Sequence, residues 1–282
     1  MATPGFRSFS PALQRFFAAT VVNMIGSAAL FGFVLIYFHE VRGISLAQAG
    51  FAVGAMSFTM VLCTPVAGFL SDRFGARRIL AAGCGVSIVA GSMYIWVASF
   101  PAAVAVSALL GVGSAMWFPA QSALLSLIVQ PHERPAVSAF SRAALNLGAA
   151  LGGVLGGFLV RSETMTAFRW LFAVNVGTYV VFLAVLPGLP PGRVEHLLPR
   201  HERSGFAVVL RDAFIVRLLA TDISVALGFG FLFAFMPAYA SQLGIGKGTI
   251  GLLFMVGAAA VVLTQIPTLH GSTGGTACGP WR

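Results

Sequence analysis

The stretch GFLSDRFGARR, residues 68–78, begins at the end of one apolar run, Ala49–Leu70, and stops where a second, Ile79–Phe100, begins. Each run reaches the roughly 20 apolar residues that a helix needs to cross a bilayer. The composition agrees, since 58% of the 282 residues are hydrophobic and 9% are charged, whereas about 25% of a soluble domain is charged. A water-soluble fold of this size would lack the charge to cover its surface, so lipid is the expected solvent.

Eight apolar segments along the chain are long enough to span a membrane: Phe16–Phe38, Ala49–Leu70, Ile79–Phe100, Ala102–Leu127, Ser138–Val160, Trp170–Leu189, Leu218–Ala240 and Thr249–Pro267. We expect helices, because a helix satisfies its own backbone in lipid and the strands of a barrel would be shorter and alternating. The expected fold class is all-α, a polytopic membrane protein. Six spans precede a long polar connection, Pro187–Arg217, and two follow it.

Basic residues in the connections predict the direction of insertion, because cytoplasmic loops carry an excess of Arg and Lys. With the N-terminus inside, four basic residues fall outside: Arg42, Arg161, Arg169 and Lys247. Twelve fall inside: Arg7, Arg15, Arg73, Arg77, Arg78, Arg134, Arg142, Arg193, Arg200, Arg203, Arg211 and Arg217. We therefore expect a multi-pass protein of a cell membrane with its N-terminus in the cytoplasm. The excess of Arg over Lys, with abundant Ala and Gly, favours a bacterial inner membrane.

Charge and reactive residues argue against other classes of protein. The net charge of +9 does not indicate nucleic acid as a partner, because the basic residues lie between apolar runs and form no basic face. Cys63, Cys84 and Cys278 show neither a paired framework nor metal-ligand spacing. The sequence contains no nucleophile elbow, phosphate-binding loop or zinc-type histidine spacing. We expect no enzyme, no metal, no cofactor and no ATP-driven transport by this chain alone.

The loop after the second span resembles the signature G-x-L-x-D-R-x-G-x-R-R of the major facilitator superfamily. The matching residues are Gly68, Asp72, Arg73, Gly75, Arg77 and Arg78. A loop that only follows the positive-inside rule would need neither the acid nor the glycines. We expect Gly68 to allow close helix packing, Gly75 to allow a tight turn, and Asp72 to form bonds that one conformation makes and another breaks. The resemblance implies a conformational gate.

A glycine stripe in the fifth span resembles an element of the family's drug/proton antiporters, G-x-x-x-G-P-x-x-G-G. Gly148, Gly152, Gly156 and Gly157 match it, and Gly153 stands in place of the proline. The first three recur at helical spacing, which predicts a flat surface where another helix approaches. In the fourth span, Ser107 stands where the family's proton-coupled members carry arginine. Both departures weaken the inference of proton coupling.

The resemblance implies two six-helix halves related as repeats. We expect residues 1–189 to form the N-terminal bundle, 190–216 the cytoplasmic central loop, and 217–267 the first two helices of the C-terminal bundle. Residues 268–282 have the composition of an atypical polar tail. Our hypothesis is a chain truncated after the eighth span by a reading-frame slip near Thr268, and a natural polar tail is the competing account.

In the family, substrates bind between the halves, near the middle of the membrane. The candidate cavity residues are Asn23, Ser27, Trp117, Gln121 and Asn146. Each of them could equally form a hydrogen bond between helices.

Asp222 is the one acidic residue inside an expected span, and such residues are costly in lipid. It is the candidate for protonation during transport. The alternative is an interfacial carboxylate that reaches Arg217.

The function implied by the resemblance is secondary active transport by alternating access, with efflux of small amphipathic compounds. The alternatives are a metabolite importer of the same superfamily or a non-transporting, truncated membrane protein. The expected partners are a small-molecule substrate, protons and the lipid bilayer, and the full-length protein is expected to be a monomer.

Overall fold

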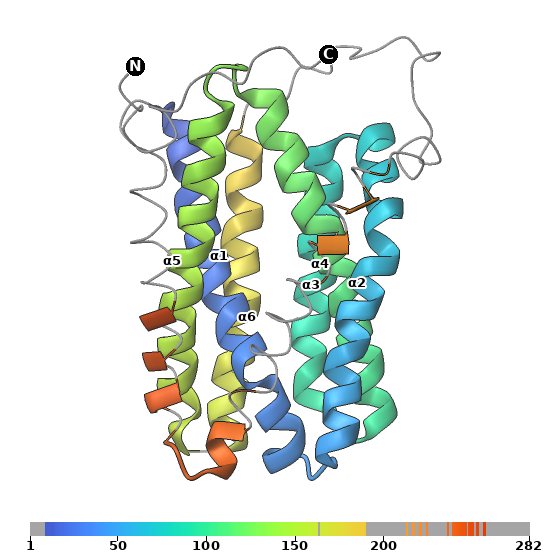
Figure 1. The fold of residues 1–282 in the computed structure, drawn as a ribbon, viewed down its shortest axis with the longest axis vertical. Helices are drawn as coiled ribbons and strands as arrows, with labels where there is room; N and C mark the ends of the chain where they lie inside the picture. Colours follow the sequence, from blue (N-terminus) through green and yellow to red (C-terminus); the bar gives the residue numbers. More distant parts are fainter. Residues whose placement is uncertain are drawn as a thin grey trace.

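The computed structural model describes residues 9–162 and 164–189, the positions 213, 216–217, 220–221, 224 and 236, and residues 239–246, 248–250, 252–253 and 256–257. Six long helices dominate the described chain (Figure 1): α1 (Pro11–Ile36), α2 (Leu46–Phe74), α3 (Ala76–Met93), α4 (Phe100–Ile128), α5 (Arg134–Leu159) and α6 (Met165–Val185). The described residues contain no strand.

Short helical turns continue four of these helices at their carboxyl ends. They are the π-helical turn η2 (Tyr37–Val41) and the 3₁₀ turns η3 (Tyr94–Trp96), η4 (Val160–Ser162) and η5 (Leu186–Gly188). Turns of the 3₁₀ kind are frequent where a helix ends, whereas a π-helical turn is rare.

Local sequence signals explain where several helices begin. The Ser10 hydroxyl accepts a hydrogen bond from the Leu13 amide at 3.4 Å, and Pro11 occupies the first turn of α1. Thr164 caps α6 in the same way, accepting from the Ala167 amide at 3.3 Å. These caps satisfy amide groups that would otherwise lack a partner at a helix start.

All six helices are long and apolar enough to cross a membrane, so the expected all-α membrane fold is confirmed. The helices α1, α2 and α5 begin three to five residues before the expected spans, because first turns that contain polar residues are also helical. The expected seventh and eighth spans, Leu218–Ala240 and Thr249–Pro267, lie mostly outside the described residues.

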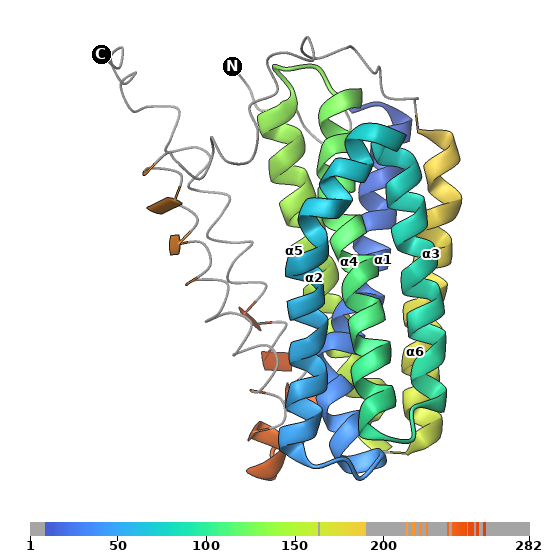
Figure 2. The ribbon, with the colours of Figure 1, turned by 90° about the vertical axis from the view of Figure 1, so that its right-hand side faces the viewer.

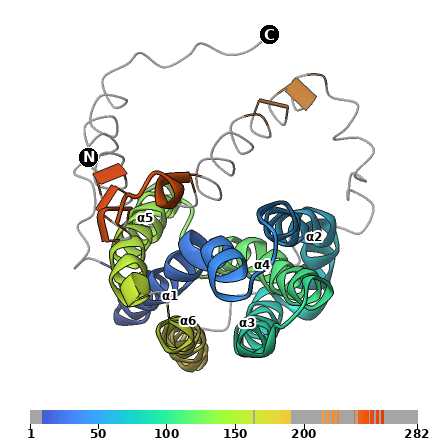
Figure 3. The ribbon, with the colours of Figure 1, turned by 90° about the horizontal axis from the view of Figure 1, so that it is seen from below.

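The six helices form two groups that meet along the centre of the bundle. One group packs α1 against α5 and α6, the other packs α4 against α2 and α3, and α3 also contacts α6. Seen along the bundle, α1 and α4 lie between the outer helices (Figure 3), and the side view shows all six running nearly parallel (Figure 2). A side chain on the inner faces of α1 and α4 can therefore meet both groups.

The surface of α2 is strongly apolar. Its exposed side chains include Phe51, Phe58, Val61, Leu62, Val66 and Phe69. Water would make such a surface costly, whereas lipid or another apolar helix would not. The observation agrees with a membrane location.

Candidate functional site

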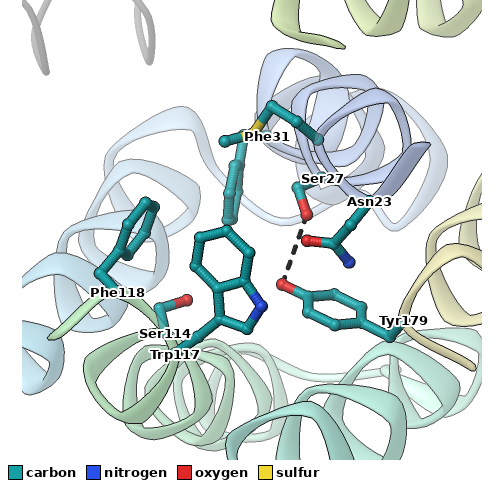
Figure 4. Close-up of a pocket in the computed structure, with 8 residues that line it drawn as sticks. Asn23, Ser27, Phe31, Ser114, Trp117, Phe118 and Tyr179 are labelled. Carbon is teal, nitrogen blue, oxygen red and sulfur yellow. Dashed lines mark hydrogen bonds between the residues drawn. The ribbon is translucent and has the colours of Figure 1, made fainter. Parts of the chain in front are cut away.

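A small pocket lies where α1, α4 and α6 meet (Figure 4). It is lined by Asn23, Met24, Ser27 and Phe31 of α1, Ser114, Trp117 and Phe118 of α4, and Tyr179 of α6. Helical spacing explains why these residues of each helix line the pocket, because residues three or four apart share one face of a helix. Asn23, Ser27 and Phe31 follow one another at intervals of four, so α1 presents two polar groups and one ring to the same space.

The polar groups of the pocket are only partly paired. The Ser27 hydroxyl donates to the Tyr179 hydroxyl oxygen at 3.3 Å, which links α1 to α6. Within the described part of the chain, Nδ2 of Asn23 and Nε1 of Trp117 are buried and have no hydrogen-bond partner. In Figure 4 the indole nitrogen of Trp117 faces the hydroxyl of Tyr179. Unpaired buried donors are costly, and a polar ligand would satisfy them.

The pocket is small, with a cavity volume of about 10 Å³, which is room for about one water molecule. Its rim residue Phe118 also lines a larger groove of about 350 Å³ between α4 and α5. The ring of Phe118 is 38% exposed, so it stands between the two spaces. Phe118 is therefore a wall residue that the two spaces share.

The structure brings together three of the five expected cavity residues, Asn23, Ser27 and Trp117. Gln121 instead lines the α4–α5 groove, and its amide nitrogen donates to the Thr20 hydroxyl at 3.2 Å. Asn146, on α5, is not part of the lining of either space. The candidate protonation site, Asp222, lies outside the described residues.

Sequence reasoning missed Ser114 and Tyr179 as pocket residues. The signal for Tyr179 was a hydroxyl-bearing ring within an apolar span, since such a hydroxyl needs a partner. The signal for Ser114 was its position three residues before Trp117 on one helix face. Neither signal identifies the neighbouring helix.

In the signature segment, residues 68–78, a single residue separates α2 from α3. Gly75 ends α2 and precedes α3 with a φ of 93°, a conformation that favours glycine. Arg77 donates from Nη1 to the Leu189 carbonyl at 3.4 Å, and the Arg73 guanidinium lies 5.5 Å from the ring centroid of Phe74. Asp72, Arg73 and Arg78 are exposed at the same end of the bundle. Three of the charged side chains of the loop are therefore accessible to another element.

Gly68 does not have the expected role within the described chain. No described atom lies within 4 Å of the position that a Cβ would take there. Its position on the exposed surface of α2 explains the difference, because none of the other described helices approaches that point.

The glycine stripe of α5 faces α1. A Cβ on Gly148 would lie 2.6 Å from the Met24 Cβ, one on Gly152 would meet the Ile25 carbonyl oxygen, and one on Gly156 would lie 2.8 Å from the Phe33 ring. The absence of side chains lets the two backbones approach closely. Gly157 is also buried.

A sequence profile of the Major Facilitator Superfamily matches residues 16–272, almost the whole of the described bundle and the segment that follows it. The chain belongs to the Major Facilitator Superfamily. The family resemblance inferred from residues 68–78 is thereby confirmed. The superfamily comprises transporters rather than enzymes, in agreement with the absence of enzyme motifs from the sequence.

Two curated relatives illustrate the similarity. The chain is 29% identical over 262 residues to the uncharacterized MFS-type transporter YqjV of Bacillus subtilis (strain 168), a match that covers 89% of this chain and 62% of YqjV. It is 26% identical over 199 residues to the multidrug resistance protein MdtH of Shigella boydii serotype 4 (strain Sb227), over 70% of this chain and 48% of MdtH. The chain thus spans less than two thirds of the length of these relatives.

Among solved structures, the fold is similar to that of a D-xylose–proton symporter. The TM-score is 0.69 at 16% identity, and the match covers 93% of this chain and 68% of the symporter. At this identity the similarity establishes the fold and does not carry over the cargo. In this fold, α1 and α4 place the polar pocket at the centre of the bundle.

Proposed function

We propose that this protein is a secondary active transporter that exports small amphipathic compounds by alternating access. One observation carries the proposal: two buried donors, Asn23 Nδ2 and Trp117 Nε1, have no partner within the described chain and border the same space between α1, α4 and α6. Small-molecule sites combine a mainly apolar lining with a few precisely placed polar groups. The name of MdtH, a multidrug resistance protein, supports export of amphipathic compounds over import.

The proposed cycle uses two helical bundles that rock around the central site. The loop around Asp72 stabilises one of the two states, because an exposed carboxylate among three arginines can form charge-assisted bonds with the opposing bundle in that state alone. The close contact of Gly148, Gly152 and Gly156 with α1 keeps these helices together as one rigid group during the movement.

The proposal leaves the coupling ion open. Ser107 occupies the position of the family's arginine, and its hydroxyl lies 3.3 Å from the Tyr94 hydroxyl on the neighbouring turn η3. It is therefore part of the contact between α4 and the end of α3. Proton coupling would need another group, for which Asp222 is our candidate.

The topology belongs to the same proposal. We place the N-terminus in the cytoplasm, residues 1–189 in one bundle, 190–216 in the cytoplasmic loop and 217–267 in the first two helices of a second bundle. The excess of basic residues at one side of the chain supports this orientation.

The test is accumulation of fluorescent amphiphiles in bacteria that lack their own multidrug exporters. Cells expressing the full chain are loaded with ethidium, a cation, or with fluorescein, an anion, and then energised with glucose. We expect lower accumulation of at least one probe than in cells with empty vector, and loss of the effect in Asp72→Asn.

Two other outcomes would decide against export. Higher accumulation of a probe in energised cells would favour the importer. Equal accumulation in the chain, the variant and the empty vector, with the protein present in the membrane, would reject transport by this chain.

A further inference from the structure

The groove between α4 and α5 has a mixed lining that the proposed cycle does not yet use. Residues from two facing helix surfaces recur every three or four positions, as expected for two parallel helices. They are Phe118, Gln121, Ser122, Leu125 and Ser126 from α4, Val129 just after it, and Arg134, Val137, Ser138, Ser141, Arg142 and Leu145 from α5. Its volume of about 350 Å³ is within the range of small-molecule sites.

The charged groups of the groove have one sign. Arg134 and Arg142 both line it, and among the described residues no acidic side chain does. The neighbouring Glu133 is engaged in the loop, where its carboxylate accepts from the Gln130 amide at 3.4 Å. Arg134 uses Nη2 to donate to the Ser126 carbonyl at 3.1 Å, which leaves further N–H groups of its planar fork for a ligand.

Arg142 lies unusually far from the helix end. It is eight residues after Arg134, the first residue of α5, or about 12 Å along the helix. A guanidinium at that depth of a membrane-spanning segment is costly, and such groups commonly face a water-filled cavity or a ligand path. The positive-inside rule counts Arg142 with the basic residues of the cytoplasmic side, and its place within α5 adds a need for a polar partner.

Hydroxyl groups converge on the same space. Ser122, Ser126, Ser138 and Ser141 line the groove, and the Ser141 hydroxyl is buried without a hydrogen-bond partner among the described residues. Two guanidinium groups and several hydroxyl donors suit an oxyanion such as a carboxylate, sulfate or phosphate. The amino-terminal end of α5 adds a partial positive charge near Arg134.

Apart from Gln121, the rest of the lining is apolar, and it extends to Phe118 beside the central pocket. Leu125, Val129 and Val137 are buried walls of the groove. The half-exposed ring of Phe118 lines both the groove and the pocket that contains Trp117. A molecule with an oxyanion at Arg134 and Arg142 would therefore place an apolar part on Phe118.

We propose that the α4–α5 groove binds the oxyanion of an amphipathic molecule, with Arg134 and Arg142 as its charge partners and Phe118 as the contact for its apolar part. The inference rests on the proposed function in taking the groove as part of the transport path. The oxyanion belongs either to a transported substrate or to an anionic phospholipid, and these two sources are distinguished by experiment.

The test measures binding, so it is independent of whether the chain transports anything. The full chain is reconstituted in phosphatidylcholine nanodiscs, and binding of octanoate is measured by calorimetry at low salt, with octylammonium as the matched cation. We expect octanoate to bind more tightly than octylammonium. Arg134→Gln and Arg142→Gln should each weaken octanoate binding by about ten-fold, because each removes a charge-assisted hydrogen bond. Arg15→Gln, an exposed arginine of α1 outside the groove, should leave it unchanged.

Nanodiscs that contain phosphatidylglycerol distinguish the two sources. Octanoate binding that persists there supports a soluble anionic substrate, and binding that phosphatidylglycerol competes away in the wild type supports a lipid headgroup at the same arginines. The inference is overturned if octanoate binds no more tightly than octylammonium, or if both arginine variants, folded by their elution profile and melting curve, bind octanoate like the wild type. Neither result would bear on the accumulation assay, which tests transport itself.

Discussion

Gly148 on α5 faces the backbone carbonyl of Val21 on α1, and a Cβ added to Gly148 would lie only 2.6 Å from that oxygen. Because a carbonyl of a helix backbone cannot move aside, the two helices would have to separate. We predict that Gly148→Ala lowers the free energy of unfolding by about 1–3 kcal/mol, the usual cost of overpacking. The measurement is the melting temperature of the purified protein in detergent, followed by size-exclusion chromatography.

Gly177 on α6 is the matched control, since no atom of the described residues lies within 4 Å of the position that its Cβ would take. Gly177→Ala should leave the melting temperature unchanged or raise it slightly, because alanine restricts the unfolded chain more than glycine does. If both variants melted like the wild type, the close approach of α1 and α5 would be disproved.

The glycine stripe illustrates what could be predicted from the sequence and what could not. The spacing of Gly148, Gly152 and Gly156 predicts a smooth helix face, which the structure places against another helix. The identity of the partner, α1, depends on the tertiary arrangement, which no local pattern encodes. For the same reason Asn23 and Ser27 could be assigned to one face, whereas their neighbour Tyr179, about 150 residues later in the chain, was missed.

The limits of prediction from sequence are clearest for the amide side chains. Asn23 and Gln121 look alike in sequence, as polar groups within apolar spans, and both were expected in the cavity. The structure gives Gln121 a partner in Thr20 and leaves Nδ2 of Asn23 with none in the described chain. Whether a buried polar group forms a hydrogen bond between helices or faces a ligand depends on atoms of another helix, so composition and periodicity cannot decide it.

Gly75 should be the least replaceable residue of the gate loop for folding. It is the single residue between α2 and α3 and has a φ of 93°, which costs a residue with a Cβ about 1–3 kcal/mol. We predict that Gly75→Ala lowers the melting temperature. Gly68→Ala, a site with open space and ordinary backbone geometry, should not lower it. Equal melting of the two variants would contradict the strained turn.

We expect the hydrogen bonds of Arg42 to stabilise the contact between the end of α1 and the turn η3 that follows α3. Its Nε donates to the Tyr37 hydroxyl at 2.7 Å, its Nη2 donates to the Ile95 carbonyl, and its guanidinium lies 5.3 Å from the centroid of the Tyr37 ring. The Tyr37 hydroxyl donates in turn to the Tyr94 carbonyl at 2.7 Å. We predict that Arg42→Gln lowers the free energy of unfolding by about 1.5–3 kcal/mol, the typical value of hydrogen bonds from a charged group.

The Arg42→Lys variant tests whether Arg42 stabilises the fold through the geometry of its hydrogen bonds or through its charge. Lysine keeps the charge and lacks the planar fork that reaches two acceptors, so it should restore only part of the lost stability. The exposed Arg161 lies at the same end of the bundle, and Arg161→Gln should have little effect on chemical unfolding. Full restoration by lysine would show that charge alone stabilises this end.

The orientation can be measured with single cysteines in a background where Cys63, Cys84 and Cys278 are replaced by serine. Ser10 precedes α1 and Ser162 lies at the opposite end of the bundle. With the N-terminus inside, a membrane-impermeant maleimide should label Ser162→Cys in intact cells and Ser10→Cys only after the cells are opened. The reverse pattern would invert the proposed topology.

Asn23→Leu tests whether the central pocket binds cargo. Leucine has a similar size, and replacing a buried donor that has no partner with an apolar group is expected to be neutral or stabilising. A structural role therefore predicts an unchanged or higher melting temperature together with unchanged export. A role in binding predicts the same melting temperature with export of the responsive probe reduced by about ten-fold, the equivalent of one hydrogen bond to cargo.

Gln121→Leu is the contrasting variant, because its amide donates to Thr20 at 3.2 Å. Removing this bond should lower the free energy of unfolding by about 0.5–1.5 kcal/mol. A stable Asn23→Leu with reduced export, beside a less stable Gln121→Leu, would place the unpaired donor of Asn23 on the cargo. If the Asn23→Leu variant exported the probe like the wild type, Asn23 would not contact the cargo. The central pocket would then not be part of the transport path.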